Sequence, residues 1–149
     1  MTDRLKTRIV VYERQDAKSP WVFQRFITEH NNWVITTCGE IAGPGSYYAL
    51  HQRNNATDSM GQAYEAEQCT GLKDKHGRLI YEGDIVKATF KYMGSNTENL
   101  CFVVAFSDGA FGYFDELGRF GLLANFGTGA MFEVIGNIHE TPELLREYI

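Results

Sequence analysis

Gln68–Phe90 reads QCTGLKDKHGRLIYEGDIVKATF, and this stretch decides the fold. Lys73–Gly77 has the composition of a turn, with Gly77 where a positive φ is tolerated. From Asp84 to Tyr92 apolar and polar residues alternate, which predicts a half-buried strand. One face of this strand carries Val86, Ala88, Phe90 and Tyr92, and the other carries Ile85, Lys87, Thr89 and Lys91.

The first part of the chain predicts further strands. Aromatic and β-branched residues favour extended structure, and the Asn31-Asn32 pair between two such runs predicts a hairpin. A glycine- and proline-containing loop should follow, then a short helix around Tyr47–Arg53 and a polar loop that ends at Gln62. The expected strands are Thr7–Tyr12, Trp21–Thr28 and Trp33–Thr37, and the loop is Cys38–Ser46.

The second part continues this pattern and then changes period. Asp108-Gly109 is a strong hairpin signal, and Leu117-Gly118 predicts another turn. After a last strand, Thr141 and Pro142 are suited to begin a short helix. The strands expected here are Tyr64–Thr70, Leu100–Ser107, Ala110–Phe114, Arg119–Leu123 and Phe132–Ile138. The chain therefore predicts a mainly β fold, a small antiparallel barrel or strongly bent sheet with a short C-terminal helix.

This pattern also predicts which residues are buried and which bend the chain. The core should contain strand residues whose side chains face inward, and glycines should lie at turns or bends. The expected core residues are Val86, Phe90, Val104, Phe106 and Val134, and the glycines are Gly71, Gly77, Gly83 and Gly136.

Length and composition limit the class of protein. The chain has 149 residues, of which 44% are hydrophobic and 13% aromatic, with a formal net charge of −5. Such a chain can bury a core, and its charge argues against a general nucleic-acid binder. The N-terminus has no apolar signal region, and the longest apolar-rich run, Leu100–Ser107, is too short to span a bilayer. We therefore expect a cytoplasmic protein without membrane contact.

Two motifs resemble those of a known family. The first is Gln68-Cys69-Thr70-Gly71-Leu72-Lys73-Asp74-Lys75, followed by Gly77 and by Ile80-Tyr81-Glu82-Gly83-Asp84-Ile85-Val86. The second is Glu133-Val134-Ile135-Gly136-Asn137-Ile138-His139-Glu140 with Pro142-Glu143-Leu144-Leu145. Both are similar to motifs of the YopX family, small proteins of phages and prophages. Cys69 stands where the family usually has an aromatic residue.

The resemblance implies a fold but no activity. It implies a mainly β protein with an SH3-like barrel element, and it carries over no catalytic residue. It covers Gln68–Ile149, so the chain is predicted to be one domain, 1–149. Within it, 1–67 is a variable N-terminal β region and 68–149 is the YopX-like barrel region.

Each candidate site has a simpler structural interpretation. Glu82 and Asp84 could bind a metal or transfer protons, but a turn at Gly83 explains them better. Asp74-Lys75-His76-Gly77 lacks the ligands of a calcium loop, and Gly43-Pro44-Gly45-Ser46 lacks the lysine and spacing of a phosphate loop. The histidines and the three cysteines have no metal-ligand spacing. They are His30, His51, His76, His139, Cys38, Cys69 and Cys101. We therefore predict no catalytic, metal or cofactor site.

Two functions remain open. The first is a non-enzymatic, phage-encoded accessory protein that binds a host or phage protein in the bacterial cytosol, for example as an inhibitor of a host or defence system. The second is a small β-barrel that binds nucleic acid through its aromatic residues and through Lys87, Lys91 and Arg119.

The edges of the sheet predict self-association. Val22–Ile27 carries several apolar residues, and Arg25 is its only charged residue. The unpaired backbone groups of such an edge strand can form hydrogen bonds with a strand of another chain. We expect a homo-oligomer formed through the N-terminal region. The alternative is a monomer whose edges are covered by Tyr47–Gln62 and the C-terminal helix.

Overall fold

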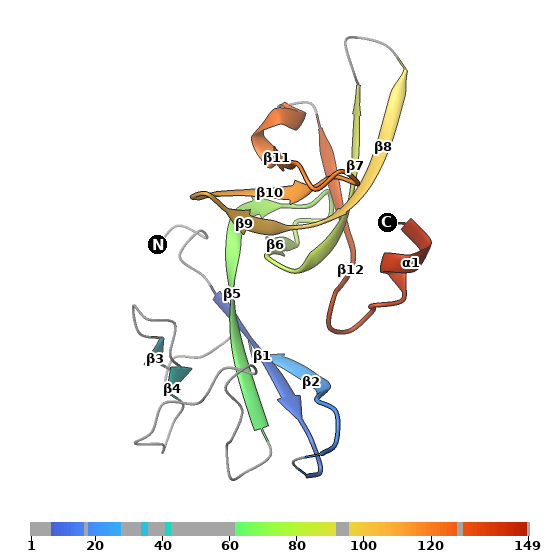
Figure 1. Cartoon of the computed structure of the whole chain (residues 1–149). Helices are drawn as coiled ribbons and strands as arrows, with labels where there is room; N and C mark the ends of the chain where they lie inside the picture. Colours follow the sequence, from blue (N-terminus) through green and yellow to red (C-terminus); the bar gives the residue numbers. More distant parts are fainter. Residues whose placement is uncertain are drawn as a thin grey trace. The chain divides into compact units, whose positions relative to one another are not determined.

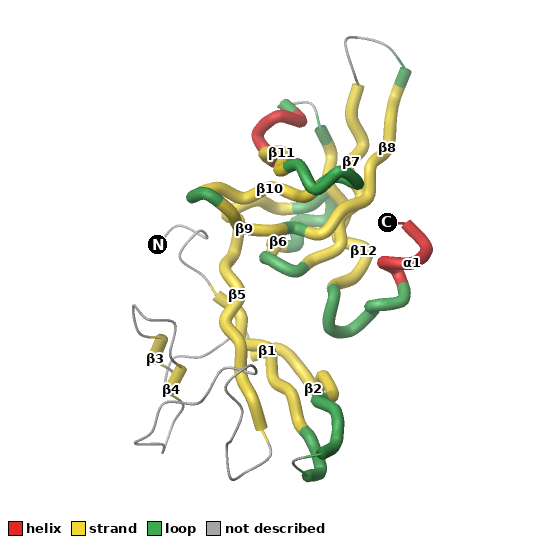
Figure 2. The backbone as a smooth tube through the Cα atoms, in the orientation of Figure 1, coloured by secondary structure: helices red, strands yellow, loops and turns green. Residues whose placement is uncertain are grey.

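The structure is a computed structural model that describes residues 7–16, 18–27, 34–35, 41–42, 62–91, 96–127 and 130–148. The strands within these ranges pair antiparallel, and Figure 2 shows strands as the main element, with short helical segments beside them. The chain divides into two compact units, residues 7–67 and residues 68–149. The mainly β prediction is confirmed. The prediction of a single domain stays a prediction.

The N-terminal unit is built around strand β1 (Thr7–Glu13). This strand lies between β2 (Val22–Ile27) and β5 (Gln62–Lys73), so it is covered at both edges, and five consecutive residues of it are buried. The small core of the unit consists of Val10 and Tyr12, with Trp21, Phe23 and Phe26 packed against them. Because consecutive residues of a strand point to opposite faces, burial of Ile9–Tyr12 means that both faces of β1 are covered, which accounts for this apolar run.

A buried ion pair joins the ends of this unit. Arg8 Nε donates to Glu67 Oε2 over 2.6 Å, and both side chains are almost fully buried. The Arg8 guanidinium also lies 4.1 Å from the centre of the Phe26 ring, where a cation is attracted to the aromatic face. These contacts satisfy two charges that would otherwise be costly to bury.

The predicted hairpin across Asn31-Asn32 is wrong. β2 pairs with β1 through a register that runs from Ile9–Ile27 to Glu13–Val22. The short strand β3 (Val34–Ile35) pairs instead with β4 (Ile41–Ala42), which falls inside the expected loop. β2 pairs with β1 over five residue pairs, whereas β3 and β4 pair over only two, so the longer pairing with the preceding strand overrides the local turn signal. β2 lies at the edge of its sheet, and the homo-oligomer stays a prediction.

The C-terminal unit is a curled half-barrel made of three groups of strands. β5 pairs with β6 (Leu79–Tyr81), and β7 (Asp84–Lys91) lies between β8 (Thr97–Val103) and β12 (Met131–Asn137). β10 (Ala110–Phe114) lies between β9 (Ala105–Ser107) and β11 (Phe120–Leu122). Figure 1 shows β8 running directly into β9, where the chain leaves one sheet and enters the next.

The predicted alternation of β7 is confirmed from Val86 to Thr89 but fails at Ile85, which was placed on the opposite face from Val86 and is nevertheless fully buried. Val86 and Ala88 are buried in the main core, and Phe90 is half-buried against it. The other buried members of this core are Ile80, Phe102, Val104, Leu123 and Val134. The stretch quoted at the outset thus provides the central strand of the half-barrel.

Phe106 was predicted to be in the core, and this prediction is wrong. Its side chain is 45% exposed and contacts Phe111 at a ring-centre distance of 5.0 Å. The cause is Val104, which lies between β8 and β9 and whose N–H donates to the Asp84 carbonyl over 2.9 Å. Because the chain bends there, the alternation of one strand does not continue into the next.

The predicted turns are confirmed where the structure describes them. Asp108 and Gly109 both have positive φ, as a two-residue hairpin between β9 and β10 requires. Gly136 lies at a register shift of β12, where a Cβ would come within 2.1 Å of Thr141 Oγ1. Only glycine allows this close approach of the C-terminal segment.

The short C-terminal helix α1 (Leu144–Tyr148) is confirmed, but its predicted cap is not. The Thr141 hydroxyl donates to the Asn137 carbonyl over 3.1 Å and accepts the Asn137 N–H over 3.0 Å. Thr141 therefore fixes the turn before the helix rather than a helical N–H group.

Candidate functional site

The side chain of Asp74 organises the first motif. Its Oδ1 accepts the N–H groups of His76 and Arg78, each over 2.9 Å, and its Oδ2 accepts the Val134 N–H over 3.1 Å. Burial raises the pKa of this carboxyl, but the N–H donors outweigh burial and hold the pKa below its ordinary value of 3.8. The carboxylate therefore joins the turn to β12.

Glu82 and Asp84 also serve the backbone. Asp84 is fully buried, and its Oδ2 accepts the Tyr81 N–H over 2.8 Å. Glu82 Oε2 lies 3.5 Å from the Gln68 N–H, and Gly83 between them has a φ of 84°. The two carboxylates bind the backbone on either side of a tight turn, as the simpler interpretation of this motif expected.

Asn137 has the same role in the second motif. It is buried, and its Oδ1 accepts the N–H groups of His139 and Glu140 over 2.9 and 2.8 Å. Its Nδ2 donates to Glu140 Oε2 over 3.3 Å. The most regular parts of the sequence are thus used to shape turns.

The other candidate residues are dispersed. His76 is exposed, with Nε2 3.7 Å from Glu133 Oε1, and Lys75 bonds the same carboxylate over 2.8 Å. Within the described ranges, no group of three or more His, Cys, Asp or Glu side chains could hold a metal ion. Burial raises the pKa of the Cys101 thiol, while nearby Lys87 lowers it.

Several predicted features lie outside the described residues. They are the loop Gly43–Ser46, the helix around Tyr47–Arg53, His30, His51 and Cys38.

The basic residues proposed to contact nucleic acid do not form a separate positive surface. Arg119 Nε pairs with Asp115 Oδ2 over 2.8 Å. Lys87 stands directly across from Glu133 in the pairing of β7 with β12. Lys91 lies at the exposed end of β7. Two of the three cations therefore have a carboxylate next to them.

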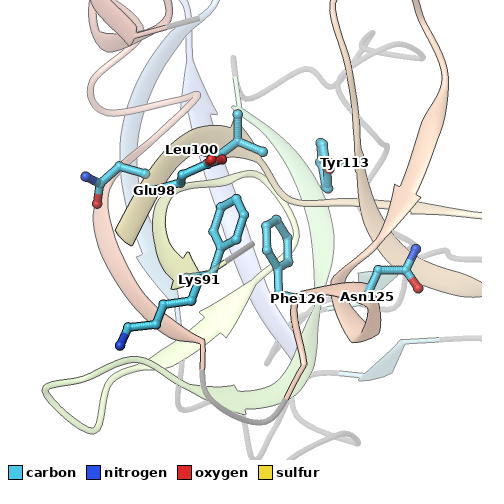
Figure 3. Close-up of a pocket in the computed structure, with 8 residues that line it drawn as sticks. Lys91, Glu98, Leu100, Tyr113, Asn125 and Phe126 are labelled. Carbon is cyan, nitrogen blue, oxygen red and sulfur yellow. The ribbon is translucent and has the colours of Figure 1, made fainter. Parts of the chain in front are cut away.

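A hollow of about 720 Å³ in the half-barrel is the best candidate for a binding site. Its lining, here called the aromatic groove, consists of Phe90, Lys91, Glu98, Asn99, Leu100, Tyr113, Asn125 and Phe126. Figure 3 shows Leu100, Tyr113 and Phe126 around the same space, with Lys91 extending away from the rings. The volume and the mixture of apolar walls with a few polar groups are typical of ligand sites.

Phe126 is the centre of the ring cluster that forms the groove. It belongs to the short 3-10 helix η3 (Leu123–Phe126), which follows β11. Its ring lies 5.1 Å from Phe90, 5.5 Å from Phe102 and 5.6 Å from Tyr113, measured between ring centres. Phe102 is buried below the rings, whereas the other three are half-buried. The rings are thus fixed by packing while one side of the cluster stays open.

Two glycines allow Tyr113 to adopt its position. Tyr113 pairs with Gly121 across the strands β10 and β11. A Cβ on Gly121 would lie 2.9 Å from the Tyr113 ring, and one on Gly112 would lie 2.1 Å from the Gly121 carbonyl oxygen. The close approach of the β10 and β11 backbones therefore allows the Tyr113 ring to line the groove.

The groove continues into neighbouring hollows. One of about 430 Å³ shares Leu100 and Tyr113 with it and adds Asp115, Glu116 and Arg119. Another, of about 320 Å³, shares Phe90, Lys91 and Phe126. Together the three hollows are lined by residues 97–102 of β8.

Sequence reasoning missed this groove. No local pattern marks Phe126, whose ring contacts rings on the four strands β7, β8, β10 and β12. The one available signal was the aromatic content of 13%.

No helix in the described part of the chain has the length and apolar character needed to cross a membrane.

Comparisons with known proteins place the chain in a family. Curated proteins give no match. The crystal structure of protein EF1440 from Enterococcus faecalis is similar, with 27% identity over 94% of this chain and 96% of that one, at a TM-score of 0.46. The YopX protein family matches residues 23–146, so the match begins well before the first motif at Gln68. The chain belongs to the YopX family.

Proposed function

We propose that this chain is a non-enzymatic binding module that takes a segment of another protein into the aromatic groove. The observation that carries the proposal is the open cluster of Phe90, Tyr113 and Phe126. Half-buried aromatic rings beside polar groups are characteristic of protein recognition sites, because they provide apolar contact area at little cost in conformational entropy.

The chemistry of the motifs supports a role without catalysis. Asp74, Asp84 and Asn137 each accept backbone N–H groups through side-chain oxygens, so these oxygens are engaged in the fold. We further propose that the protein is a phage-encoded accessory factor that acts on a host or phage protein in the bacterial cytosol, for example as an inhibitor. Membership of the YopX family supports this finer statement.

Capture from bacterial lysate with the full chain tests the proposal. Asn125→Trp places a large side chain at the exposed rim of the groove and leaves the core rings untouched. Ala124→Trp is the matched control, because Ala124 is the exposed neighbour on η3 and lines a different hollow. We expect a specific protein to be retained by the wild type and the control and lost from Asn125→Trp.

Three results would contradict the proposal. They are retention of the same protein by Asn125→Trp, recovery of nucleic acid in place of protein, and turnover of a small substrate by the purified chain. Nucleic-acid binding through phosphates would weaken steeply as salt is raised, so a salt titration identifies that outcome.

A further inference from the structure

Carboxylates lie beside the rings of the aromatic groove. Glu98 lines the groove itself, and it stands directly across from Phe90 in the pairing of β7 with β8. Glu116 lines the adjoining hollow, on the other side of Leu100 and Tyr113. Both glutamates are exposed, so both are accessible to a ligand.

The nearby cations leave these two carboxylates available. Arg119 is engaged by Asp115, whose Oδ1 also accepts the Arg119 N–H. Lys91 extends away from the rings in Figure 3. In the part of the chain that the structure describes, neither Glu98 nor Glu116 forms an ion pair.

We propose that the segment bound in the groove is basic, with an arginine or lysine whose cation lies against the rings and meets Glu98. This inference rests on the proposed function and specifies its ligand. Aromatic faces attract cations, and a carboxylate adds a charge-assisted hydrogen bond to the same group. The net charge of −5 attracts a basic segment from a distance. Because the two hollows share a wall, one extended segment reaches Glu98 and Glu116 together.

The test is selection of a displayed random-peptide library on the immobilised full chain, followed by binding measurements on the selected peptides. We expect arginine and lysine to be enriched. Glu98→Gln should weaken binding about tenfold, the loss expected for one charge-assisted contact of about 1.4 kcal/mol. Lys91→Gln should strengthen the binding of the basic peptides, because it removes a positive charge from the lining of the groove. Glu143→Gln is the matched control, since it removes an exposed carboxylate that does not line the hollows.

The outcomes separate this inference from the proposed function. Selected peptides that are apolar or acidic, and that are lost with Asn125→Trp, overturn the basic ligand but retain the groove. Basic peptides that bind equally to Glu98→Gln and Glu143→Gln overturn the assignment of Glu98, because binding then reflects net charge alone. A library that yields no peptide dependent on the groove overturns both.

Discussion

The C-terminal unit contains the same turn twice, in two environments. Asp74–Arg78 and Asp115–Arg119 both read Asp-x-x-Gly-Arg. In each, the aspartate N–H donates to the arginine carbonyl, and the glycine N–H donates to the aspartate carbonyl. In each, Oδ1 accepts two N–H groups over 2.9 Å. The local sequence therefore specifies the same backbone turn in both places.

The second carboxylate oxygen distinguishes the two turns. Asp74 is buried, and its Oδ2 reaches the Val134 N–H on a strand distant in sequence. Asp115 is at the surface, and its Oδ2 holds the side chain of Arg119. One turn connects strands and the other only closes on itself. The comparison teaches that a turn motif predicts local geometry, whereas its contribution to stability depends on what lies around it.

The largest expected effect is from removing the buried carboxylate. Asp74→Ala should lower the free energy of unfolding by about 3 kcal/mol or more, because the buried Val134 N–H and two part-buried turn N–H groups lose their acceptor. Asp115→Ala should lower it far less, since water replaces the acceptor there. Denaturant titration of both variants measures the difference. Equal losses would show that burial does not distinguish the turns.

Replacing the glycine of either turn should lower the free energy of unfolding by the same amount, so these variants measure backbone strain separately from burial. Gly77 and Gly118 have φ of 80° and 75°, and a Cβ at either position meets no atom within 4 Å. Each change to alanine should cost about 1 kcal/mol, the strain of an L-residue in this conformation. A clear difference between the two in the same denaturant titration would mean that the turns differ in backbone strain as well as in burial.

Lowering the pH should reduce the stability that each of the two aspartates contributes. Hydrogen-bond donors hold the pKa of both aspartates below 3.8, with burial opposing this at Asp74 and the Arg119 N–H the main cause at Asp115. A depressed folded pKa stabilises the protein above the unfolded pKa, and this stabilisation is lost as the pH falls through the folded value. Stability measured below about pH 4 should therefore fall less steeply in Asp74→Asn and Asp115→Asn than in the wild type. A steeper fall in either variant would contradict the assignment.

The smallest effect concerns the arginines. Arg119 pairs with Asp115 at the surface, whereas Arg78 makes no ion pair within the described ranges. Exposed ion pairs contribute little and are screened by salt. Any difference in melting temperature between Arg119→Gln and the wild type should disappear at high salt. Arg78→Gln serves as the control and should show no such salt dependence.

These two turns also show how far the sequence predicts this protein. Lys73–Gly77 and Leu117-Gly118 were predictable because glycine and aspartate act on their immediate neighbours. The alternation of β7 after Ile85 was predictable because successive side chains of a strand point to opposite faces. The bond from Asp74 to Val134 was not, because it joins residues that no local pattern relates. The exposure of Phe106 and the role of Phe126 depend on how strands bend toward one another, and this is why the groove could not be predicted.

The Arg8–Glu67 pair sets an order of events during folding. The two residues are separated by 59 positions, and β1 is complete only when β5 lies beside it. During synthesis β1 leaves the ribosome before β5, and it cannot bury its arginine until Glu67 has also emerged. Closing so long a loop is slow compared with forming the hairpin at Asp108-Gly109. β1 is therefore made before the segment that it needs in order to fold, and it must wait for β5.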